Sequence, residues 1–197
     1  MSGAYAAFQF NRSIEASKDR KIIIEGLRHN IFIVAVKLRQ LRTIKERMLD
    51  PSENVELRWA QMRDFKKIDE KEKIDFSTLR FTQEEYPQFL MELNVAEDDY
   101  RLSIRTMNER SKMYKEIIYP VQYKVANDPE TPDTYDEMNK HIDTASRLHL
   151  SGETDTCYSI IPRTIQLFEE HHEVLLTIAR KRFPEVSFLE HDENVRK

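Results

Sequence analysis

The pattern Glu169–Glu170–His171–His172 is the strongest candidate for chemistry in this sequence. Its Glu-x-x-His spacing puts Glu169 and His172 on one face of a helix, as in the di-iron sites of helical bundles. Such a site needs a second Glu-x-x-His pair and two further core glutamates, and no second pair occurs here, since Glu137 and His141 are four residues apart. Glu169 and His172 are therefore candidate metal ligands, but they supply only half of the di-iron motif. The alternative is a core histidine at 172 that is hydrogen-bonded to a neighbouring carboxylate.

The other histidines and the single cysteine support weaker hypotheses. His149 lies on an apolar stripe and could meet His172 across the core, where the pair would titrate near neutrality. The alternative is two histidines that are half-exposed or have their hydrogen bonds satisfied elsewhere. His29 and His141 could act in a phosphoryl relay, although neither has a recognisable phosphotransfer context. Cys157 has no basic residue within five positions, which predicts a passive, half-buried thiol.

Composition excludes several function classes. Only 3 glycines occur, scattered along the chain, so a glycine-rich phosphate loop or dinucleotide fingerprint is excluded. The net charge of −4 argues against non-specific nucleic-acid binding, which depends on neutralising phosphates. We expect no cofactor, and the balance of these observations favours a protein that is not an enzyme.

The same composition predicts an all-α fold. The 197 residues are 40% apolar and 34% charged, with only 3 Gly and 7 Pro, which suits long solvated helices better than a strand-rich fold. We expect a single domain over 1–197, built as a roughly antiparallel bundle of three to four long helices. A shorter helical cap is expected at about residues 50–94.

Periodicity and helix-breaking residues give the expected elements. A long helix runs from about residue 24, or from further upstream, to 48, and a weaker helix covers 53–70. The sequence Thr82–Glu85 matches a capping box before a short helix through Leu93, with Pro87 in its first turn. Further helices are predicted at 97–118, closed by Tyr119–Pro120, at 133–152, and at 154–181, where Pro162 should kink the helix or mark its start.

The first long helix has an apolar face wide enough for more than one neighbour. Its stripe comprises Ile24, Leu27, Ile31, Val34, Leu38, Leu41 and Met48, with Lys45 interrupting it. Ile22, Ile33 and Val36 lie beside this stripe. We expect burial on two sides within one chain or a homodimer contact.

The N-terminal region has the residue composition of a juxtamembrane segment. Residues 4–21 pass from Ala, Tyr and Phe to mixed charges, as expected just beyond the cytoplasmic end of a transmembrane helix. In one interpretation the chain is the soluble part of a membrane-anchored bacterial protein whose anchor was removed. In the other, 1–20 is an ordinary frayed helix start. No apolar run in the sequence is long enough to span a bilayer.

Charge asymmetry bears on the same question. The first 49 residues hold ten Lys and Arg against four Asp and Glu, while the whole chain carries −4. The candidate contacts to an anionic membrane surface are Lys37, Arg39, Arg42 and Arg47. A solvated helix face is the alternative. The expected location is the cytoplasm, on the inner face of the membrane in the anchored interpretation.

These observations lead to two hypotheses about function. The first is a non-enzymatic helical interaction or scaffold module that binds a protein partner or associates with itself. The second is a metal-dependent, di-iron-like bundle enzyme that uses Glu169 and His172. The long apolar stripes favour the first hypothesis, whereas only half a motif supports the second.

Overall fold

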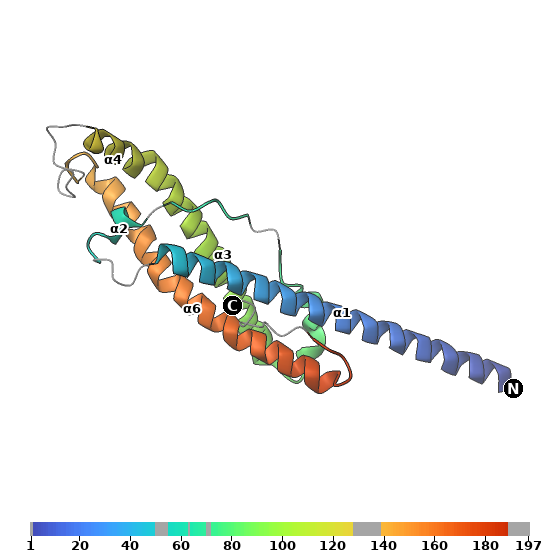
Figure 1. Ribbon diagram of the computed structural model, residues 1–197. Coiled ribbons are helices and arrows are strands. Elements are labelled where there is room, and N and C mark those ends of the chain that lie inside the picture. Colours follow the sequence, from blue (N-terminus) through green and yellow to red (C-terminus); the bar gives the residue numbers. More distant parts are fainter. Residues whose placement is uncertain (1, 50–54, 63, 70–71, 128–138, 189–197) are drawn as a thin grey trace, which may run out of the picture. The chain divides into compact units, whose positions relative to one another are not determined.

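The computed structural model describes residues 2–49, 55–62, 64–69, 72–127 and 139–188, and it is all-α (Figure 1). In chain order the elements are α1 (Ser2–Met48), α2 (Arg58–Gln61), the 3-10 helix η1 (Phe76–Thr82), α3 (Pro87–Met113), the π-helix η2 (Tyr114–Ile118), α4 (Tyr119–Ala126) and α6 (Thr144–Arg182). Helix accounts for 82% of the described residues, and these ranges contain no strand. The predicted all-α bundle is confirmed.

The contacts divide the chain into two compact units. The first comprises Met1–Leu38, Glu72–Val95 and Leu167–Lys197, and the second comprises Arg39–Lys71 and Ala96–Gln166. The long helices α1, α3 and α6 each contribute residues to both units. The single domain over 1–197 stays a prediction.

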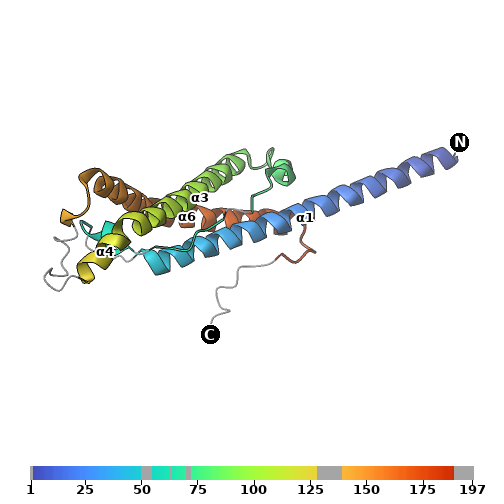
Figure 2. The same ribbon diagram turned by 90° about the horizontal axis from the view of Figure 1, so that it is seen from above.

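Within the second unit, α3 and α6 run antiparallel, as their ribbons in Figure 2 also show. The hydroxyls of Ser103 and Thr164 are 3.4 Å apart, and the thiol of Cys157 lies 3.9 Å from the sulfur of Met107. Further along α3, Nε of Arg110 lies 3.4 Å from the hydroxyl of Thr154. As the residue number rises along α3, the residue number of the contact on α6 falls, so the two helices run in opposite directions.

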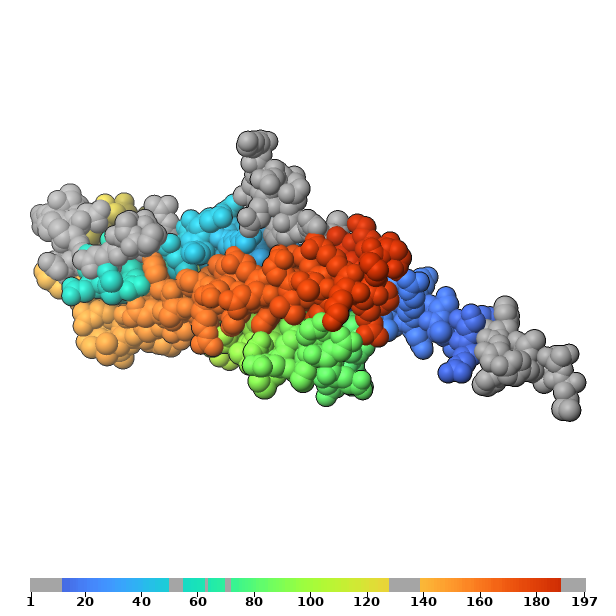
Figure 3. All heavy atoms as spheres, turned by 90° about the horizontal axis from the view of Figure 1, so that it is seen from below, coloured from blue at the N-terminus to red at the C-terminus, as the bar shows by residue number. Residues whose placement is uncertain are grey.

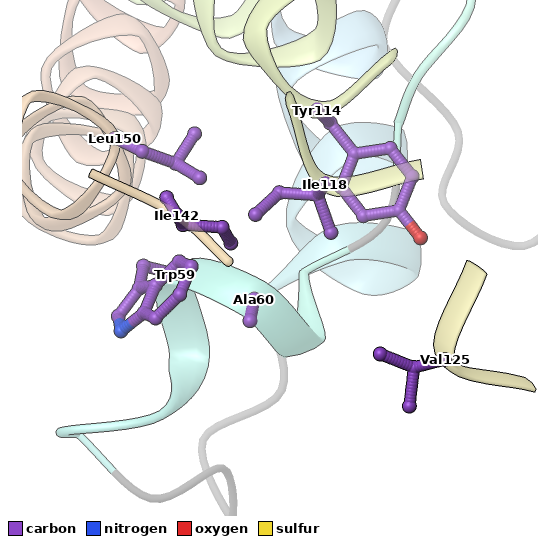
Figure 4. Packing of buried hydrophobic residues seen from close by; sticks show 7 residues of the cluster. All are labelled: Trp59, Ala60, Tyr114, Ile118, Val125, Ile142 and Leu150. Atoms are coloured by element: carbon purple, nitrogen blue, oxygen red, sulfur yellow. The ribbon is translucent and has the colours of Figure 1, made fainter. Parts of the chain in front are cut away.

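One core cluster of the second unit joins α2 to three other helices (Figure 4). Its buried members are Trp59, Ala60, Tyr114, Ile118, Val125, Ile142 and Leu150. The guanidinium of Arg110 is fully buried beside this cluster, where it donates to the carbonyl of Trp59 over 2.8 Å. The same guanidinium stacks 5.1 Å from the ring centroid of Tyr114. A buried cation is tolerated here because its N–H groups have partners.

The helix at 97–118 was predicted too short at both ends. It begins at Pro87, which confirms that Pro87 lies in a first turn, and it continues through η2 and α4 to Ala126. The expected stop at Tyr119–Pro120 is therefore wrong. Proline at 120 removes one helical N–H, and the π-helical turn immediately before it lets the backbone continue.

The expected break near Gly152 is also wrong, because α6 runs unbroken through both Gly152 and Pro162. Its start is set by Asp143, whose carboxylate accepts from the N–H of Ser146 over 2.9 Å. Of the predicted helix over 133–152, residues 133–138 lie outside the described ranges.

The region predicted as a cap, about 50–94, holds shorter helices than expected. Among the described residues of the predicted helix at 53–70, only those of α2 are helical, and Val55 is exposed. The predicted capping box is absent, since Thr82 ends η1 and its hydroxyl donates to the carbonyl of Leu79 over 2.7 Å.

In the first unit, η1 is fastened to α1 through the fully buried side chain of Asn30. The Asn30 amide group donates to the carbonyl of Asp75 over 3.1 Å and to the hydroxyl of Thr78 over 2.9 Å. Its Oδ1 accepts from the N–H of Asp75 over 2.7 Å. One side chain of α1 thus pairs with three polar groups in and next to η1.

The apolar stripe of α1 is largely confirmed, with one change of position. Leu27, Ile31, Val34, Leu38, Leu41 and Met48 are buried, and Ile24 is half-buried. Lys45 is exposed and does not interrupt the stripe, because the buried position is Ile44. Ile33 is also buried, so part of α1 has neighbours on two sides, whereas Ile22 remains exposed.

Candidate functional site

The candidate metal ligands lie on the part of α6 that belongs to the first unit. His172 is buried and Glu169 is half-buried. Nowhere in the described ranges do three or more His, Cys, Asp or Glu side chains gather in a way that could hold a metal ion. Within those ranges, the Glu-x-x-His half motif is not completed by a second set of ligands.

The adjacent His171 is also packed inside the first unit. Its ring meets Phe89 edge-on, with centroids 5.8 Å apart. Its Nε2 has no hydrogen-bond partner among the described atoms. The two neighbouring histidines are thus core residues, which the apolar stripe predicted for position 172 only.

Of the two alternatives for His149 and His172, the core pair does not form. His149 belongs to the second unit, its side chain is 66% exposed, and its Nε2 lies 3.6 Å from a carboxylate oxygen of Glu153. His172 belongs to the first unit and is buried. His29 and His141, the candidates for a phosphoryl relay, are both exposed.

Cys157 is fully buried rather than half-buried. Loss of water around the thiol raises the pKa of Cys157 to about 12, because the thiolate is the form that burial disfavours. The nearby charge of Arg110 lowers this pKa only in part. A thiol that stays protonated at neutral pH is a poor nucleophile, as the sequence predicted.

The four basic residues predicted to contact a membrane surface differ in their exposure. Lys37 is 2% exposed, so the prediction that it contacts an outside surface is wrong. Arg39 and Arg47 are exposed and Arg42 is half-buried, all three in the second unit. Helix periodicity explains the difference, because Lys37 falls between the buried Val34 and Leu41 on the inner face of α1.

The clearest surface feature of the first unit is the exposed part of α1, residues 12–22, which we call the α1 arm. Every residue of the arm is exposed, including Ile14 at 38% and Ile22 at 58%. Arg20 secures it, through an ion pair with Glu185 and a cation–π contact at 5.7 Å to the ring of Phe183. In Figure 3 the blue arm extends past the red end of α6.

A second surface feature was missed from the sequence. The C-terminal end of α6 and the turn before α3 enclose a pocket lined by Phe81, Thr82, Glu85, Tyr86, Ile178, Lys181 and Arg182. The sequence showed the basic run Arg180–Arg182, but the helix dipole accounts for that run without a site. Nothing local indicated that residues almost a hundred positions apart would meet there.

Comparison with protein-family models, curated proteins and solved structures found no match to this chain. Among the described helices, none combines the length and the apolar character that crossing a membrane requires.

Proposed function

We propose that this chain is a non-catalytic helical interaction module whose docking surface is the α1 arm, and that the occupant is a second copy of the chain. The observation that carries the proposal is the exposure of every residue from 12 to 22 in a continuing helix. Helices in water draw most of their stability from tertiary packing of one face. A partner along the arm would supply that packing.

The spacing of the arm's apolar residues supports helix-to-helix docking. Ile14, Lys18 and Ile22 follow at four-residue intervals, so they share one face of the helix. Both isoleucines are exposed on that face. Lysine stems cover apolar surface while their ammonium groups stay in water, so Lys18 is compatible with packing there.

Charge favours a second copy over an anionic surface as the occupant. Lys21 pairs with Glu25 at 3.7 Å beside the isoleucine face, and Lys18 and Glu15 add one charge of each sign. The arm itself holds four basic side chains, Arg12, Lys18, Arg20 and Lys21, and two acidic ones, Glu15 and Asp19. The ion pairs of Arg20 with Glu185 and of Lys21 with Glu25 offset this excess, whereas helices that bind anionic lipid keep an unpaired excess of Lys and Arg on their polar face. A face with both signs can pair with its own copy.

Light scattering after size exclusion tests the proposal. We expect a concentration-dependent dimer with Kd on the order of 10 μM, because the interface is short. Ile14→Glu and Ile22→Glu should each shift the chain to monomer, since a charge would be desolvated in the contact. The matched control is Leu148→Glu, which places the same charge at an exposed leucine outside the arm; Leu148 is 66% exposed.

Two results would contradict the proposal. One is a wild-type chain that stays monomeric at millimolar concentration. The other is equal behaviour of Ile14→Glu and Leu148→Glu. Co-sedimentation with vesicles of anionic lipid covers the membrane alternative, because binding that is lost in Lys18→Glu would make lipid the occupant instead.

A further inference from the structure

A pocket of about 140 Å³ opens between η1, the turn before α3 and the last turn of α6, all within the first unit. Phe81 and Ile178 give it apolar walls. Three charged side chains, Glu85, Lys181 and Arg182, line it together with Tyr86. Such a combination of apolar walls and a few convergent polar groups is typical of ligand sites.

Aromatic rings hold the two cations in place. The guanidinium of Arg182 lies 4.6 Å from the ring centroid of Phe81. The ammonium of Lys181 lies 5.7 Å from the ring centroid of Tyr86 and 3.2 Å from the Tyr86 hydroxyl. The hydrogen bond to Tyr86 raises the pKa of Lys181, so its positive charge is secure at neutral pH. Both cationic groups thus lie against an aromatic ring, while the side chains of Lys181 and Arg182 stay 68% and 41% exposed and open to a ligand.

Glu85, the acidic residue of the pocket, lies too far from these cations for close hydrogen bonds. Glu85 lies 3.8 Å from Lys181 through one carboxylate oxygen and 3.8 Å from Arg182 through the other. Charge-assisted hydrogen bonds are about 1 Å shorter than this. The Glu85 side chain is also 54% exposed, so water competes for it. The pocket therefore retains one net positive charge and donor groups that a closer oxygen could use.

We propose that this pocket binds a monoanionic carboxylate with a small apolar body. The carboxylate would accept from Arg182 and Lys181, and its apolar part would lie against Ile178 and Phe81. A phosphate dianion fits less well, because Glu85 would repel its second charge. This proposal does not depend on the function of the α1 arm.

The size of the pocket limits the source of the carboxylate. At about 140 Å³ the space is smaller than the pockets that hold drug-sized ligands, so it takes one small molecule or one side chain. A free small carboxylate and an acidic side chain of a protein partner offer the same group. Two probes separate these sources: sodium benzoate, and glutamate acetylated at its amine and amidated at its α-carboxyl.

The test is a titration of the full chain followed by methyl NMR of isoleucine. The Ile178 signal is assigned by its absence in Ile178→Leu. We expect a saturable shift of this signal with Kd on the order of 1 mM for the better probe. Tighter binding of benzoate would point to a free metabolite, and tighter binding of capped glutamate to a protein partner. Benzamide, which has the same shape without the charge, should not saturate.

Three variants make the result specific. Arg182→Gln and Lys181→Gln should each weaken binding about tenfold, since each removes a charged donor. Glu85→Gln should tighten binding several-fold, because it removes the competing carboxylate, and a gain of affinity cannot arise from misfolding. Equal shifts with benzamide, no shift of Ile178 with either probe, or weaker binding by Glu85→Gln would overturn the proposal.

Discussion

Gly26 on α1 faces Thr78 on η1 so closely that no side chain fits between them. A Cβ at position 26 would stand 2.4 Å from the Cβ of Thr78 and 2.7 Å from its hydroxyl oxygen. Glycine inside a helix ordinarily weakens it. The role of Gly26 in the first unit is instead to let η1 approach α1.

Replacing Gly26 by alanine should therefore destabilise the first unit. Alanine improves helix propensity by about 1 kcal/mol, but forcing η1 away from α1 costs about 1–3 kcal/mol. We expect a lower urea midpoint by circular dichroism. The matched control is Gly152→Ala in α6, where the added Cβ meets no atom within 4 Å beyond its chain neighbours and the adjacent helix backbone. This variant should gain up to about 1 kcal/mol. Equal gains from both variants would show that the close approach does not exist.

Asn30→Ala should loosen η1 from α1. It removes the acceptor of the Asp75 N–H, whereas the Asp75 carbonyl keeps the hydroxyl and the N–H of Thr78 as donors, so we expect a cost of about 1 kcal/mol, that of one hydrogen bond. Hydrogen exchange followed by mass spectrometry should show faster exchange in the variant than in the wild type at residues 74–79, and the same exchange in both proteins at residues 100–110. Unchanged exchange at 74–79 would mean that Asn30 does not fasten η1.

Burial of Cys157 predicts a pH-dependent loss of stability. Burial raises the pKa of the Cys157 thiol in the folded chain to about 12 from its ordinary value of 9.0. Between these values the unfolded chain releases a proton that the folded chain retains, so stability falls as pH rises from 9 towards 12. Urea unfolding at pH 8 and pH 10 should show a smaller loss for Cys157→Ala than for the wild type. Equal losses would contradict the burial.

The same burial should make the thiol unreactive in the folded chain. An aromatic disulfide reagent at pH 8 should modify Cys157 only on unfolding, because attack requires the thiolate. A cysteine introduced at Ser17, an exposed position, should react at once. Fast reaction of the folded wild type would mean that position 157 is accessible.

The half motif at Glu169 and His172 predicts little metal in the purified chain. Iron, manganese and zinc measured in protein prepared without metal-affinity steps should stay well below one atom per chain, and His172→Leu should not change them. A near-integral metal load that His172→Leu abolishes would restore the enzyme hypothesis.

Periodicity predicted the helix faces well but placed the helix ends poorly. Leu27, Leu38 and Leu41 of the first helix are buried as their periodic spacing predicts, because burying apolar area dominates the energy. Gly152, Pro162 and Pro120 were expected to end or kink helices. Each costs only a few kcal/mol, which packing along α6 and the π-helical turn before Pro120 overcome.

The candidate sites were less predictable than the fold. A Glu-x-x-His pair shows that two side chains share a helix face, but not whether other ligands face them. The pocket at Lys181 depends on a hydrogen bond to Tyr86, 95 positions away, which no local pattern encodes. Exposure of Ile22 likewise depends on where the neighbours of α1 end.

A spin label on Ser17→Cys tests most directly whether two copies dock through the α1 arm. The thiol of Cys157 is buried and does not react, so the label attaches at position 17 alone. Pulsed dipolar spectroscopy on the concentrated chain should show a defined distance between labels on two copies. Adding Ile14→Glu should abolish that distance, and adding Leu148→Glu should preserve it. Absence of any dipolar signal at concentrations where the wild type is fully dimeric by light scattering would contradict docking through the α1 arm.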